Sequence, residues 1–232
     1  MKSINSLVFI TGLVLCGCNQ TNATIENKTE HLKVSTESKG AADSKDKREI
    51  QALIRKAINW ANSKNTINLL PAVQDKKGRT YTGFDLAEHK QNLQKLEASN
   101  LFAAEFINNY NQIILKLNQQ LKKGSYGPWL VGDMPSFTFA SDVDPWTLCQ
   151  DVPYDKPNPY DFIETEVVSL TSSKGELDWK WGGLGPEHDP VPGYDPGWKK
   201  FKYRFRTVKE NNQWKIAYLE GFDLKASTAK SF

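Results

Sequence analysis

The sequence predicts an α+β domain, because the spacing of its apolar residues changes along the chain. Apolar residues recur every three or four positions between Ile50 and Leu121, which is the period of helices that bury one face. After Gly124 the chain becomes rich in glycine, proline and aromatic residues, and then alternates with the period of two that strands follow. Helices followed by a run of antiparallel strands belong to the α+β class. We therefore expect N-terminal helices packed against a curved antiparallel sheet.

The first helix is predicted to begin at Asp46, because Asp46 and Glu49 have the spacing of a capping box. Its apolar face consists of Ile50, Leu53, Ile54, Ala57, Ile58 and Ala61. A polar loop from Gln74 to Thr82 is expected to follow.

Two further helices are predicted before Gly124. Asp85 and Glu88 repeat the capping arrangement at the start of the second helix. The apolar residues that follow are Leu86, Leu93 and Leu96. The third helix is the longest, and its stripe consists of Phe102, Phe106, Tyr110, Ile113, Ile114, Leu117 and Leu121. Gly124 is placed to end it, and we expect this helix to form the core of the fold.

Strands are predicted over Phe162–Leu170 and Glu176–Trp181, with a Ser-Ser-Lys-Gly turn between them. A third strand is predicted where Phe201, Tyr203 and Phe205 alternate with lysine and arginine, which gives a half-buried strand with a basic outer face.

The last predicted strand closes a hairpin. The tight turn is expected at Glu210-Asn211-Asn212, and Trp214, Ile216 and Tyr218 alternate after it. This pair of strands is the clearest hairpin signal in the chain.

The C-terminal run Tyr203–Phe222 resembles the closing hairpin of nuclear transport factor 2-like domains. More narrowly, helices leading through Asp144-Pro-Trp-Thr-Leu-Cys-Gln-Asp151 to that hairpin resemble domain-of-unknown-function 3828, a family that contains small envelope lipoproteins. The resemblance implies a nuclear transport factor 2-like or cystatin-like cone, with a pocket between helix and curved sheet. Members of the family lack an established common activity. If such a pocket exists, the polar residues nearest to it on the helix stripes are Asp85, Glu105 and Tyr110.

The first eighteen residues have the features of a targeting signal. Lys2 precedes the apolar run Leu7–Leu15, which is too short to span a bilayer but suits a signal peptide. Leu15-Cys16-Gly17-Cys18 resembles the lipobox of bacterial lipoproteins, so we expect residues 1–17 to be removed and Cys18 to carry lipid. The alternative is an ordinary secretory signal that releases a soluble protein. By the family rule, Asn19 after the cysteine favours the outer membrane, facing the periplasm, over the inner membrane.

Residues 18–46 are predicted to form a lipidated tether, because they hold almost no large apolar residue and cannot bury enough surface to fold. A flexible coil of this length holds a domain roughly 30 Å from the membrane. Residues 47–232 have a length suited to one α+β domain.

The sequence contains none of the metal-binding or catalytic motifs that can be recognised from residue spacing alone. Asp142, Asp144 and Asp151 form a weak candidate for calcium, but they lack the spacing of a calcium loop, and turn chemistry is the favoured explanation. His188 lies between two acids and is read as a surface histidine. We expect no metal and no cofactor.

Tryptophan and tyrosine gather in the predicted loops. Trp146, Trp181, Tyr194 and Trp198 are the candidates for a partner-binding patch, with packing against the sheet as the alternative. His31 and His89 are expected to have no role, the second because it falls on the polar side of its helix. Cys149 is expected to be a small buried residue rather than a reactive thiol.

The net charge of +3 is too small and dispersed to favour nucleic acid as a partner. The sequence favours a membrane-anchored, non-catalytic module that binds an envelope protein or a cell-wall component. The alternatives are a periplasmic enzyme that binds a small molecule in a conical pocket, and an immunity-type protein against an envelope-acting toxin.

Overall fold

A computed structural model describes residues 36–63, 66–150, 163–180 and 202–230. The helices in these ranges are α1 (Thr36–Ala61), α2 (Leu86–Ser99), α3 (Ala104–Lys122), the 3-10 helix η3 (Glu220–Phe222) and α4 (Leu224–Ser227). The strands are β1 (Ala72–Gln74), β2 (Thr80–Phe84), β3 (Trp129–Leu130), β4 (Glu164–Leu170), β5 (Lys174–Lys180), β6 (Tyr203–Glu210) and β7 (Gln213–Leu219). They form antiparallel sheets of order β1-β2-β3 and β4-β5-β6-β7. The predicted α+β class is confirmed.

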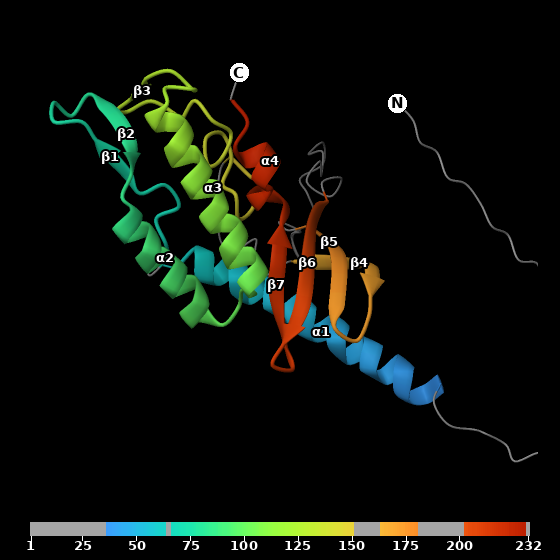
Figure 1. The fold of residues 1–232 in the computed structure, drawn as a ribbon. Coiled ribbons are helices and arrows are strands. Elements are labelled where there is room, and N and C mark those ends of the chain that lie inside the picture. The colour runs from blue at the N-terminus through green and yellow to red at the C-terminus, as the bar shows by residue number, and fades with distance from the viewer. Residues whose placement is uncertain (1–35, 64–65, 151–162, 181–201, 231–232) are drawn as a thin grey trace, which may run out of the picture. The chain divides into compact units, whose positions relative to one another are not determined.

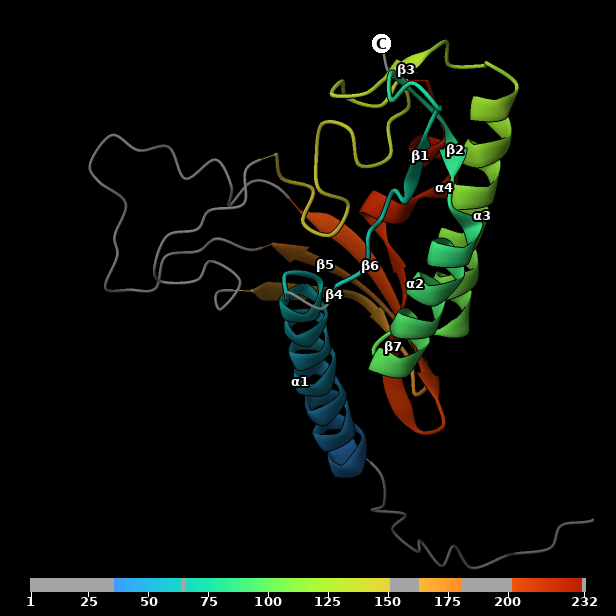
Figure 2. The ribbon, with the colours of Figure 1, turned by 90° about the vertical axis from the view of Figure 1, so that its left-hand side faces the viewer.

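The four-stranded sheet has an apolar inner face that α1 covers. Leu177, Phe205, Ile216 and Leu219 point to this face and are fully buried. Helix α1 contacts both β7 and β4, so it crosses the whole sheet, whereas α3 lies beside β7 (Figures 1 and 2). Among the described residues, no helix is both long and apolar enough to cross a bilayer.

Helix α1 begins earlier than the sequence predicted. Its first residue is Thr36, so the stretch from Thr36 to Asp46, which we assigned to the tether, is helical. Asp46 is therefore not a helix cap. Its Oδ1 accepts hydrogen bonds from Trp214 Nε1 at 2.9 Å and Lys209 Nζ at 3.0 Å, which ties α1 to the sheet. The capping pattern misled because an acidic pair three residues apart is also common within helices.

The predicted loop Gln74–Thr82 contains the turn of a hairpin, but its two ends belong to β1 and β2. Asp75 Oδ1 accepts from the backbone N–H of Arg79 at 2.8 Å, and Gly78 adopts a φ of +65°, which suits glycine. The strands were missed because two to five residues are too few to display a period.

Helix α2 begins as predicted, and two of its predicted apolar residues, Leu93 and Leu96, pack in the core. Asp85 caps it, accepting from the N–H groups of Ala87 and Glu88 at 2.8 and 3.0 Å. The polar residues His89 and Asn92 are buried as well, whereas Leu86 is exposed. The expectation that His89 lies on the polar side was wrong, because its Nε2 pairs with Asn111 Oδ1 at 2.9 Å inside the α2–α3 contact.

Helix α3 confirms its predicted stripe. Phe106, Tyr110, Ile113, Ile114 and Leu117 are all fully buried. Phe102 lies before the helix, where the segment Leu101–Ala103 runs beside β7: Ile216 N donates to Leu101 O at 2.9 Å, and Ala103 N donates to Ile216 O at 2.8 Å. The helix ends at Lys122, and Gly124 follows with a φ of +67°.

The β6–β7 hairpin turns at Asn211 and Asn212, whose φ angles of 51° and 62° are those of a two-residue type I′ turn. The pairing then shifts, because Arg206 faces Tyr218 while Thr207 faces Ile216. Ala217 is thus an extra residue on β7. This bulge turns Tyr218 to the outer face, so the expectation that Tyr218 shares a face with Trp214 and Ile216 was wrong.

Candidate functional site

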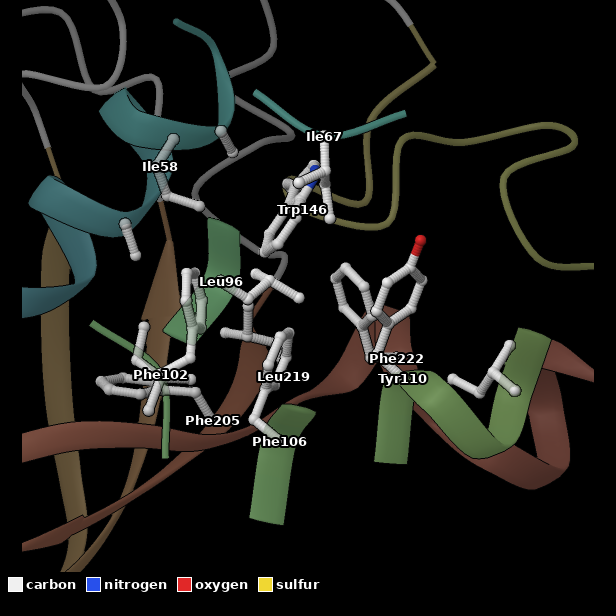
Figure 3. Packing of buried hydrophobic residues seen from close by; sticks show 14 of the residues in the cluster. Ile58, Ile67, Leu96, Phe102, Phe106, Tyr110, Trp146, Phe205, Leu219 and Phe222 are labelled. Carbon is white, nitrogen blue, oxygen red and sulfur yellow. The ribbon is translucent and has the colours of Figure 1, made fainter. Parts of the chain in front are cut away.

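The interior between α1, α3 and the sheet is filled by aromatic rings. Figure 3 shows Phe102, Phe106 and Phe222 gathered around Trp146. The ring centroid of Trp146 lies 4.6 Å from that of Phe222, 5.6 Å from Phe102 and 6.0 Å from Phe106. Trp60 of α1 adds an edge contact to Trp146 at 6.0 Å. Packed rings therefore occupy the region in which we expected a conical pocket.

Trp146 is consequently a core residue, and its assignment to a partner-binding patch was wrong. It is only 5% exposed, because the loop that carries it folds over the ring cluster. Trp181, Tyr194 and Trp198 lie outside the described residues, as do His188 and Cys18.

Asp144 organises the turn that presents Trp146. Its carboxylate accepts from Trp146 N at 3.3 Å and Thr147 Oγ1 at 3.0 Å. Burial raises the pKa of Asp144, and the hydrogen bonds from Thr147 and Trp146 oppose that rise. The carboxylate of Asp144 therefore stabilises the turn. Within the described ranges no three metal-binding side chains come together, and Asp142 is exposed, while Asp151 lies outside those ranges.

The three polar residues nominated for a pocket are spread apart. Asp85 is the cap of α2. Tyr110 is fully buried and donates to Leu69 O at 3.0 Å, and burial followed by the charge of Glu88 raises its pKa above the ordinary range. Glu105 lies on the surface of α3, where it lines a groove.

We call this groove the α3 groove. It is a surface hollow of about 290 Å³ between α3 and the outer face of β6–β7, and α4 begins at its end. Glu105, Asn108, Asn109 and Gln112 of α3 form one wall, and Arg206, Ala217, Tyr218, Asp223 and Leu224 form the other.

The charged groups of the α3 groove are arranged around Tyr218. Arg206 Nη2 lies 3.5 Å from Glu105 Oε1, and the guanidinium sits over the Tyr218 ring at 4.7 Å from its centroid. Burial, together with the charges of Asp223 and Glu220, raises the pKa of Tyr218. Like an ordinary tyrosine, Tyr218 is protonated at neutral pH, so its hydroxyl can donate a hydrogen bond.

The α3 groove continues along the helix. A second, more open hollow of about 480 Å³ is lined by Gln112, Leu115, Lys116, Gln119 and Leu224. The two hollows share Gln112 and Leu224, so they form one trough on the same side of α3.

The basic face predicted for β6 exists, but acidic neighbours neutralise it. Arg204 reaches Glu176 and Asp178 on β5, each at 2.5 Å, and Lys202 pairs with Glu166 on β4. These cations already have partners, which makes them poor candidates for an anion site. The α3 groove is the better candidate.

Sequence reasoning placed Glu105 near a site but missed its partners. Arg206 and Tyr218 come from strands about a hundred residues away in the chain, and only the bulge at Ala217 brings Tyr218 to the outer face. The spacing of Glu105, Asn108 and Gln112 on one side of α3 was the available signal. Comparisons with protein-family models, curated proteins and solved structures found no match.

Proposed function

We propose that this chain is a bacterial envelope lipoprotein, anchored by lipid on Cys18, whose folded domain is a non-catalytic binding module. The support for the anchor is the sequence Leu15-Cys16-Gly17-Cys18 after a short apolar run. The outer membrane, facing the periplasm, is the proposed location.

The observation that carries the binding role is the ring-filled interior. An enzyme of the pocket type would place a carboxylate or histidine in a cavity that excludes water. Here Trp146, Phe106 and Phe222 pack in that region, each at most 5% exposed. The α3 groove instead opens to solvent, and the Glu105 side chain, which pairs with Arg206, is 55% exposed. Such a surface suits recognition of a ligand rather than acid–base chemistry.

The proposed architecture is that of the nuclear transport factor 2-like group, in which domain-of-unknown-function 3828 is the nearer resemblance. Three features support it: α1 crosses the sheet, the strands form a meander, and the β6–β7 hairpin closes it. Under this proposal the cone is present but its cavity is packed with side chains.

Cell fractionation tests the proposal. The wild-type chain is expected in the membrane fraction, and Cys18→Ala in the soluble fraction. Cys149→Ala is the matched control and should stay on the membrane, because Cys149 lies far outside the lipobox-like sequence that ends at Cys18. Membrane association of Cys18→Ala that equals wild type would refute the anchor.

In-cell crosslinking with the lipidated protein then distinguishes the binding roles. Capture of an envelope component supports the proposed role. Capture of a single secreted toxin, with protection of cells that express the chain, would replace it with the immunity-type alternative. Turnover of a small periplasmic substrate by the purified chain would replace it with an enzyme.

A further inference from the structure

Some amide side chains of helix α3 hold other parts of the chain, whereas others are open to solvent. Asn109, Asn111 and Asn118 each hold another part of the chain: Asn109 Nδ2 donates to Phe222 O at 2.6 Å, Asn111 pairs with His89, and Asn118 Oδ1 accepts from Phe84 N at 3.0 Å. The side-chain amides of Asn108, Gln112 and Gln119 make no hydrogen bond to the described residues, and all three residues are exposed. All three lie along the trough.

These open amides extend over a considerable length. From Glu105 to Gln119 the helix rises about 21 Å, at 1.5 Å per residue. An amide both donates and accepts, so a row of them matches a ligand that carries hydroxyl and amide groups along its length. Exposed Leu115, together with Leu224, offers apolar surface beside them.

The charges of the trough balance. Arg206 and Lys116 are positive, and Glu105 and Asp223 are negative. Glu105 pairs with Arg206, and Asp223 Oδ1 caps α4 by accepting from Ala226 N at 2.8 Å. A strongly charged polymer would therefore gain little electrostatic binding energy in the trough, whereas a neutral polar polymer meets no charge repulsion there.

The trough offers an extended peptide no strand edge to which it could add. Peptides that add to a sheet need unpaired backbone groups at a strand edge. The trough lies over the outer face of β6–β7, and the free edge of β7 is already paired at Ile216 with the segment Leu101–Ala103.

We infer that the trough along α3 binds a neutral, N-acetylated glycan strand, with Asn108, Gln112 and Gln119 bonding its hydroxyl and acetamide groups. This inference rests on the proposed function, since it names the ligand class of the same binding module.

Titration of the full chain, purified in detergent, with tetra-N-acetylchitotetraose tests the inference. The wild type should bind it, and Asn108→Ala/Gln112→Ala should weaken binding about tenfold or more, as loss of several hydrogen bonds requires. Gln91→Ala/Gln94→Ala removes two exposed amides from α2 and is the matched control, expected to bind as wild type.

A second measurement avoids dependence on any variant. Chemical-shift changes in the wild-type chain on adding the tetrasaccharide should concentrate at the side-chain amides of Asn108, Gln112 and Gln119. Absence of binding, shifts located elsewhere, equal binding by the trough variant, or preferential binding of an acetylated penta-alanine peptide would each overturn the inference. If the glycan fails but a crosslinked envelope protein is captured through the trough, the proposed binding role survives and the ligand class is wrong.

Discussion

Trp146 offers the sharpest test of the core, because the sequence left open whether it packs inside the fold or forms part of a binding patch. The substitution Trp146→Ala removes a ring that is 5% exposed and lies within about 6 Å of Trp60, Phe102, Phe106 and Phe222. Buried tryptophan to alanine changes cost about 3–5 kcal/mol, since transfer and cavity terms add. At about 2–4 °C per kcal/mol for a domain of this size, the melting temperature should fall by about 6–20 °C.

The assay is thermal unfolding followed by far-ultraviolet circular dichroism. Met134→Ala is the control, because its side chain is 66% exposed and its loss should shift the midpoint by no more than about 2 °C. A Trp146→Ala midpoint that matches wild type would mean that the ring lies on the surface, and the packed-interior argument would fail.

Three further predictions concern single contacts. Asp46→Ala should cost about 2 kcal/mol in the free energy of unfolding, because Trp214 Nε1 and Lys209 Nζ lose a charged acceptor; urea denaturation that shows no loss would contradict the α1–sheet contact. Burial lowers the pKa of His89, with the Asn111 hydrogen bond opposing it, so the folded state favours neutral imidazole and stability should fall as pH drops from about 6.5 through the folded pKa. His89→Gln should flatten this slope in unfolding midpoints between pH 7.5 and 5, and an unchanged slope would exclude His89 as its source. Asn212→Val should cost about 1–2 kcal/mol and Asn212→Gly almost nothing, because the residue has a φ of 62°; equal stability of the two variants would contradict the type I′ turn.

The sequence predicted an element correctly where the residues that define its period are also the residues that pack in the core. The stripe Phe106–Leu117 predicted α3 because packing and period coincide on one helix face. Likewise Asn211-Asn212 specified the β6–β7 turn, since both residues tolerate a positive φ.

The sequence pattern gave the wrong exposure for side chains whose burial depends on partners far away in the chain. His89 was expected on the polar side of its helix, yet it is buried and its Nε2 pairs with Asn111 Oδ1 at 2.9 Å. Asn92 on the same helix is also buried, and its Nδ2 donates to Asn68 O at 2.8 Å. The bulge at Ala217 has no local signature, so the outward turn of Tyr218, and with it the groove wall, was beyond prediction from the sequence.

The central claim is that a binding domain is held at the membrane through Cys18, and mass spectrometry of the mature N-terminus tests it most directly. Tryptic digestion of the membrane-extracted chain should yield the peptide Cys18–Lys28 with its first cysteine modified by a diacylglyceryl group and fatty acyl chains. An unmodified peptide that begins at any other residue, or an intact Met1, would contradict the claim.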